Sequence, residues 1–62
     1  MTREEITKRI EALSEEMFLL GKDCTSQHFN EEGNIRAALR VAGELLKNTS
    51  YTLDDIAGEL SA

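Results

Sequence analysis

The sequence predicts an all-α fold, in which an antiparallel helical hairpin carries a short third helix at its C-terminal end. Three observations support this prediction. Proline is absent from the 62 residues, apolar residues recur at spacings of three and four, and apolar and polar residues do not alternate over any useful length. A chain of this size holds one hydrophobic core at most, so residues 1–62 are expected to form a single small domain.

The first helix is expected over about residues 2–20. Thr2 and Glu5 have the spacing of a capping box, in which each side chain binds the other residue's backbone N–H. Five apolar residues follow at spacings of four and three, which predicts a narrow seam facing one other helix. Gly21 would then end the helix in a left-handed conformation. The seam residues are Ile6, Ile10, Leu13, Met17 and Leu20.

The second helix is expected over about residues 30–47, after a polar connector in which Phe29 is a candidate buried residue. Asn30 or Asn34 could cap it, and Glu31 and Glu32 favour the earlier start through the helix dipole. Its seam is widened on one side to an apolar arc of roughly 200°. Small residues at 38, 42 and 43 would permit close helix approach. The seam comprises Ile35, Leu39, Ala42 and Leu46, and the widening residues are Ala37, Ala38, Val41 and Leu45.

A break at Asn48-Thr49-Ser50 separates a predicted third helix, over about residues 52–60. Thr52 would cap it, and Asp55 occupies the capping-box position. Tyr51 and Ile56 occupy the two positions of a hydrophobic staple. A helix of under three turns is marginal alone, so this one would have to dock on another surface.

Composition narrows the classes of function. Seven basic residues against twelve acidic ones give a net charge of −5, which disfavours non-specific nucleic-acid binding. The single cysteine, Cys24, cannot form an intrachain disulfide and fits a reducing compartment. The N-terminus lacks the pattern of a signal peptide, and the longest apolar run, 17–20, is far too short to span a membrane. We therefore expect a cytoplasmic protein.

Residue patterns typical of catalysis, cofactor binding or metal binding are not evident. Cys24 and His28 would share a helix face, but two ligands do not make a structural zinc site. The glutamates of the first helix would lie on its solvent side, where a carboxylate has no cleft to act in. These are Glu4, Glu5, Glu11, Glu15 and Glu16. The sequence therefore indicates a protein that is not an enzyme and holds no metal or cofactor.

Apolar residues outside the seam indicate association with another polypeptide. Phe18, Leu19, Val41 and Leu45 point away from the seam and are the candidate interface residues. A homodimer of hairpins, forming a four-helix bundle, would bury them. The alternative is a monomeric three-helix domain, in which the third helix, Phe29 and Tyr51 cover this surface. The leading interpretation is a non-enzymatic regulator, adaptor or inhibitor, like small proteins of bacteria or their phages.

Two other functions stay open. Residues 51–60 resemble the first helix of a helix-turn-helix unit, and residues 35–42 resemble the helix that precedes such units in winged-helix repressors. This resemblance implies a DNA-associated regulator, in which Arg36, Arg40 and Lys47 would contact phosphates. The excess of acidic residues suggests instead a nucleic-acid mimic that binds a basic protein.

Overall fold

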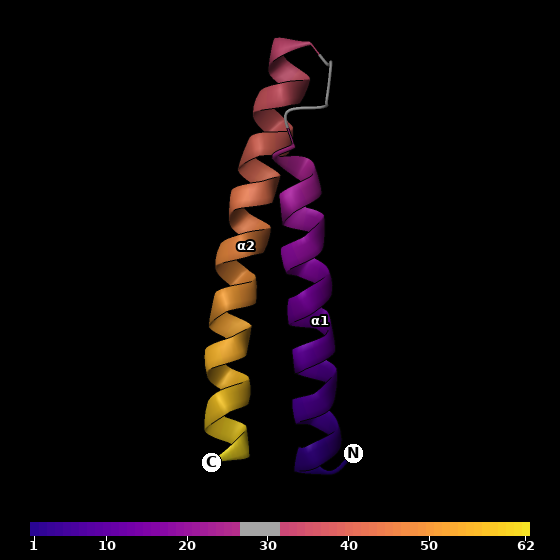
Figure 1. The fold of residues 1–62 in the computed structure, drawn as a ribbon, viewed down its shortest axis with the longest axis vertical. Helices are drawn as coiled ribbons and strands as arrows, with labels where there is room; N and C mark the ends of the chain where they lie inside the picture. The colour runs from indigo at the N-terminus through magenta and orange to yellow at the C-terminus, as the bar shows by residue number, and fades with distance from the viewer. Residues whose placement is uncertain (27–31) are drawn as a thin grey trace.

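A computed structural model describes residues 1–26 and 32–62 of the chain. It contains two helices, α1 (Arg3–Cys24) and α2 (Gly33–Ser61), which pack side by side in antiparallel orientation (Figure 1). The rod measures 45 × 16 × 13 Å, and both termini lie at one end. The helices are closest near the hairpin end and separate gradually toward the termini. The all-α helical hairpin predicted from the sequence is therefore confirmed.

The start of α1 follows the predicted capping box. The Thr2 hydroxyl accepts a hydrogen bond from the Glu5 backbone N–H at 3.1 Å, and the Glu5 carboxylate accepts one from the Thr2 N–H at 3.4 Å. The predicted end of this helix is wrong. Gly21 lies inside α1 with an ordinary helical backbone, and the helix continues to Cys24.

The third helix predicted from the sequence is wrong, because α2 continues without a break through residues 48–50 to Ser61. Hydroxyl groups in this stretch bond to the helix backbone instead of ending the helix. Ser50 Oγ donates to the Lys47 carbonyl at 2.8 Å, and Thr52 Oγ1 donates to the Asn48 carbonyl at 3.2 Å. Thr52 is therefore an interior residue of α2 and not a cap.

The start of the second helix differs from the prediction within the described residues. Helix α2 starts at Gly33, with Glu32 in the cap position and no capping bond from its side chain. Asn34 consequently lies inside the helix. Phe29, Asn30 and Glu31 lie outside the described residues.

Small residues form the contact between the helices. The buried residues of α1 and α2 recur every seven positions, and none of them has a large side chain. We call these six residues the contact row. Of the residues that the structure describes, Ala57 is the only buried hydrophobic one. The two helices therefore meet by close backbone approach, without a core of large apolar side chains. The contact row consists of Thr7, Ser14, Gly21, Gly43, Ser50 and Ala57.

The predicted seam does not lie between the helices. Its members Ile6, Leu13, Leu20 and Ile35 are exposed, and the other five are half-buried. The true contact on α1 falls one residue later in the sequence, at 7, 14 and 21. One residue turns a helix by roughly 100°, so the apolar stripe faces sideways. The half-buried members are Ile10, Met17, Leu39, Ala42 and Leu46.

Candidate interaction surface

The register of the hairpin is fixed by two direct contacts. Gly21 lies against Gly43, and the Ser14 hydroxyl donates to the Ser50 carbonyl at 2.8 Å. A further step of seven residues along each helix brings Thr7 to the level of Ala57. Each small residue of α1 is therefore matched by one of α2.

Glycine is required where the helices are closest. A β-carbon added to Gly21 would lie 2.9 Å from the Gly43 carbonyl oxygen and 2.9 Å from Lys47 Cγ. One added to Gly43 would overlap the Thr25 methyl group and lie 2.8 Å from the Gly21 carbonyl oxygen. Carbonyl oxygens of a helix cannot move aside as a flexible side chain can, so this contact excludes even a methyl group.

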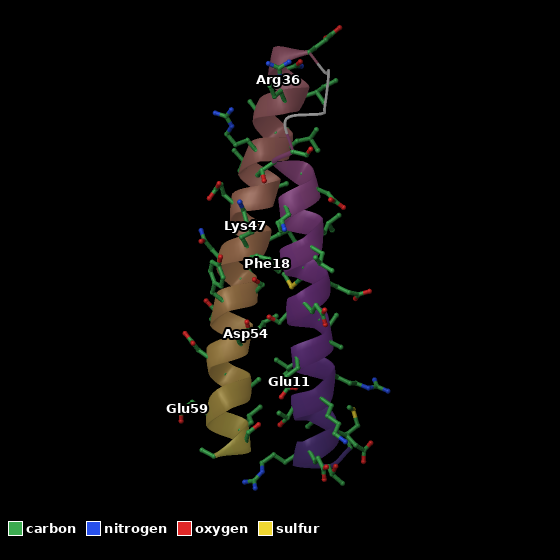
Figure 2. The ribbon with its side chains drawn as sticks, in the orientation of Figure 1. Glu11, Phe18, Arg36, Lys47, Asp54 and Glu59 are labelled. Carbon is green, nitrogen blue, oxygen red and sulfur yellow. The ribbon has the colours of Figure 1, made fainter. Side chains whose placement is uncertain are left out.

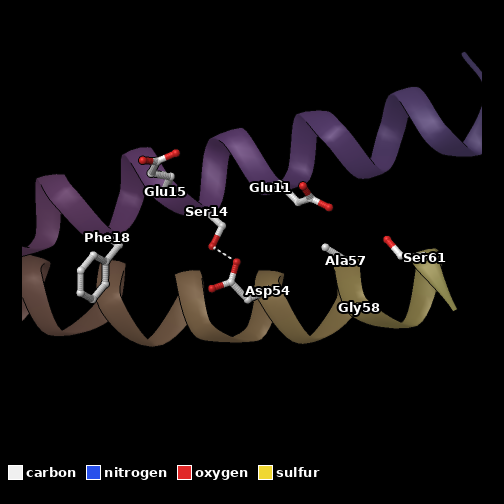
Figure 3. A pocket seen from close by; sticks show the side chains of 8 residues that line it. All are labelled: Glu11, Ser14, Glu15, Phe18, Asp54, Ala57, Gly58 and Ser61. Carbon is white, nitrogen blue, oxygen red and sulfur yellow. Dashed lines mark hydrogen bonds between the residues drawn. The ribbon is translucent and has the colours of Figure 1, made fainter.

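One side of the hairpin is polar. Consider the residues that follow each contact-row residue by one or by four positions. They are turned by roughly 100° and 40° from the contact row, and on both helices they are turned to the same side of the hairpin. Six of them line a single groove together with Ser14 and Ala57 (Figure 3), so this side is shared by both helices. We call it the polar flank. Its members are Lys8, Glu11, Glu15, Phe18, Lys22, Thr25, Glu44, Lys47, Tyr51, Asp54, Gly58 and Ser61.

The groove on the polar flank is open and has a volume of about 590 Å³. Carboxylates of Glu11, Glu15 and Asp54 line it. The Asp54 carboxylate lies 2.7 Å from the Ser14 hydroxyl (Figure 3) and shares its proton with the Ser50 carbonyl. Within the described residues, no group of three or more histidine, cysteine, aspartate or glutamate side chains is arranged to hold a metal ion.

Phe18 belongs to the polar flank and packs within its own chain. Its ring centroid lies 6.0 Å from that of Tyr51 at an interplanar angle of 52°, and the Lys22 ammonium lies 5.9 Å from the Phe18 ring centroid. Tilted aromatic pairs and cations over rings are both attractive arrangements. This candidate interface residue is half-buried between α1 and α2.

The opposite side of the hairpin is apolar. The residues that precede each contact-row residue by one or by four positions are turned from the contact row by the same angles in the opposite direction. On both helices they therefore lie on the side away from the groove. Ten of these twelve residues are apolar, and the other two are Thr49 and Arg3, the first residue of α1. We call this side the apolar flank. Its members are Ile6, Ile10, Leu13, Met17, Leu20, Leu39, Ala42, Leu46, Thr49, Leu53 and Ile56, with Arg3 at its terminal end.

The apolar flank runs along most of both helices and is open to solvent. Arg3, Ile6, Leu13, Leu20 and Ile56 are exposed, and the remaining members are half-buried. Large apolar side chains placed side by side over this length form the kind of patch that marks an interaction surface. The predicted seam of α1 and most of that of α2 thus belong to the flank.

The candidate interface residues from the sequence are not brought together. Leu19, Val41 and Leu45 are exposed, but each lies roughly 140–160° around its helix from the contact row, on the side remote from the other helix. Phe18 lies on the polar flank (Figure 2). The four residues therefore do not form one patch on the hairpin.

The basic residues considered for nucleic-acid binding lie on α2 toward the hairpin end. Lys47 pairs with Glu44 at 3.9 Å, and its stem covers Gly21, so most of its side chain is buried (Figure 2). Arg36 and Arg40 are exposed. Residues 35–42 and 51–60 form parts of one continuous helix, whereas the resemblance implies two separate helices.

A signal for the contact row was present in the sequence. Small residues recur every seven positions at 7, 14 and 21 and again at 43, 50 and 57, with the same period as the apolar stripe.

Within the described residues, neither helix has a stretch long and apolar enough to cross a bilayer. The sequence matches no protein-family model, and comparison with curated proteins and with solved structures gives no significant match.

Proposed function

We propose that this chain is a non-enzymatic protein that acts by association with another polypeptide through its apolar flank. The simplest partner is a second copy, so that two hairpins pair into a four-helix bundle. The observation that supports this proposal is that the residues between the two helices are small, whereas the large apolar residues lie on an open side. Small residues hold the hairpin together, whereas ten apolar residues line its open side.

The energetics of a lone hairpin support this proposal. Burying a large aliphatic side chain stabilises a fold by about 1.5–3 kcal/mol, and of the described residues only Ala57 is a buried hydrophobic one. Chains below roughly 70–80 residues usually need a disulfide, a metal or self-association to reach useful stability. Cys24 is the only cysteine, which excludes an intrachain disulfide. Covering the apolar flank would supply the missing burial.

The geometry of a helical bundle fits this arrangement. In a four-helix bundle each helix contacts two neighbours, and therefore needs two contact faces. The contact row supplies the face within the hairpin. The apolar flank supplies a second face, turned sideways, which a pair of helices from another chain can cover.

A matched pair of substitutions tests the proposal. Leu13 and Leu19 are exposed to almost the same extent, 53% and 52%, but Leu13 lies on the apolar flank and Leu19 on the outer side of α1. We expect Leu13→Glu to reduce the mass measured by sedimentation equilibrium to that of one chain and to lower helicity. Leu19→Glu should keep the mass and helicity of the unchanged protein.

Two results would count against this use of the flank. One is the finding that the unsubstituted protein is monomeric, fully helical and stable at micromolar concentration. The other is an equal loss of mass in both variants, which would show that the outer side of α1 contributes as much as the flank. Phe18→Glu and Leu45→Glu, at two candidate interface residues, extend the same measurement to the polar flank and the outer side of α2.

A further inference from the structure

We propose that the second copy covers the apolar flank in inverted orientation, with the hairpin end of each chain beside the terminal end of the other. A two-fold axis would then pass close to Thr49. This inference rests on the proposed function, since it describes how the second copy sits on the flank. The size of the side that carries the flank supports a second copy as its occupant, and two further observations support the inverted orientation: the distribution of charge along the rod and the position of Thr49.

The side of the rod that carries the apolar flank, over residues 6–20 and 39–56, has close to the area of a stable dimer interface. The broad side of the rod measures 45 by 16 Å, which projects to roughly 700 Å². Stable protein interfaces bury about 800 Å² on each partner. A second copy of the same length therefore covers this side completely, with no apolar end left over.

Two symmetric arrangements bring the two flanks together. If the hairpin ends coincide, each α1 faces the α2 of the partner. If the copies are inverted, each helix faces its own copy in antiparallel orientation. Both bury the same residues, so apolar area alone does not choose between them.

Charge distinguishes the two arrangements. The terminal half of the rod, residues 1–15 and 49–62, has three basic and seven acidic residues, whereas residues 16–48 have four basic and five acidic ones. Coincident ends would bring together two halves with a net charge of −4 each. Packed helices lie about 8–10 Å apart, close to the Debye length at physiological salt, so this repulsion is only partly screened. Inversion places each acidic half beside a half of charge −1.

Thr49 supplies an independent argument. Apart from Arg3 at the terminal end, it is the only polar member of the apolar flank, it is half-buried, and its hydroxyl makes no hydrogen bond with the described residues. It also lies near the middle of the flank on α2. In the inverted dimer the middle of α2 meets its own copy, so the two Thr49 hydroxyls can bond to each other. With coincident ends, Thr49 would face the apolar Leu13 of the partner.

Polar residues within an apolar helix contact select the alignment that pairs them. Thr49 and the charge distribution therefore favour the same arrangement. The polar flanks of the two copies would face outward on opposite sides of the bundle, with their acidic grooves at opposite ends.

Disulfide trapping tests the orientation. In a Cys24→Ser background, one chain carries Thr49→Cys and a second carries Leu13→Cys. The molecular mass of each reduced variant is first measured by sedimentation equilibrium. The two variants are then mixed, unfolded, refolded together and oxidised. Disulfides form when α-carbons lie about 4.4–6.8 Å apart. The inverted dimer predicts that the Thr49→Cys chain bonds to itself, at a yield about tenfold or more above that of the mixed disulfide.

The outcomes separate the two proposals. Dimers in which the mixed disulfide between Thr49→Cys and Leu13→Cys predominates would overturn the inverted orientation and retain association through the flank. If the reduced variants and the unsubstituted protein all sediment as monomers, the dimer itself is overturned, and the orientation with it.

Discussion

Gly21 and Gly43 face each other across the hairpin with no space for a methyl group between them. A β-carbon on Gly21 would lie 2.9 Å from the Gly43 carbonyl oxygen. In an isolated helix, alanine is more favourable than glycine by about 1 kcal/mol. Here the clash with the facing backbone should outweigh this preference, since overpacking a tight contact costs about 1–3 kcal/mol. We therefore expect Gly21→Ala and Gly43→Ala each to lower the free energy of unfolding, measured by urea denaturation.

Gly58 provides the control for this prediction. It lies in the same helix as Gly43, but a β-carbon there would meet no atom within 4 Å. Gly58→Ala should therefore stabilise the protein by about 0.5–1 kcal/mol through helix propensity alone. If Gly21→Ala stabilised the protein as much as Gly58→Ala, the close approach of α1 and α2 described above would be wrong.

Ser14 links the two helices by hydrogen bonds at the centre of the contact row. Its hydroxyl lies 2.8 Å from the Ser50 carbonyl oxygen and 2.7 Å from the Asp54 carboxylate. Ser14→Ala keeps the small size that the contact requires and removes the single hydroxyl proton that these two acceptors share. We expect a loss of about 1 kcal/mol in the free energy of unfolding. Ser61→Ala, an exposed serine lining the same groove, should change it by less than about 0.5 kcal/mol.

Much of the fold could be predicted from local patterns. The capping box of Thr2 and Glu5 marks the start of α1, and the spacing of apolar residues identifies both helices. The turn residues were less informative. Asn48, Thr49 and Ser50 have side chains that favour breaks, but the hydroxyls of Ser50 and Thr52 bond to the backbone of an unbroken helix.

The direction of the apolar stripe could not be predicted, for a physical reason. Two rows of residues share a period of seven: the large apolar row that includes Leu13 and the small row that includes Ser14. Periodicity shows that both rows lie along the helix, but not which of them faces the other helix of the same chain. That choice depends on how closely two backbones can approach, which Gly21 and Gly43 decide only when they are paired in space.

Phe18 and Tyr51 should be coupled in stability within one chain. Their ring centroids lie 6.0 Å apart, and such tilted aromatic pairs contribute about 0.5–1.5 kcal/mol beyond the burial of area. A double-mutant cycle with Phe18→Ala and Tyr51→Ala should give a coupling in this range by chemical denaturation. Sedimentation of both variants should give the mass of the unchanged protein. A loss of mass in Phe18→Ala would instead support Phe18 as an interface residue.

The stability of the protein should depend on its concentration. Ala57 is the single buried hydrophobic residue among those described, so the proposed association would add a large share of the apolar burial. Folding coupled to dimerisation makes the melting temperature rise with chain concentration, by mass action. We expect a clear increase in Tm, followed by circular dichroism, between about 1 and 100 µM chain, and a smaller or absent increase for Leu13→Glu. A Tm that stayed constant over this range would mean that one chain is stable with its apolar flank in water, against the energetics of so small a hairpin.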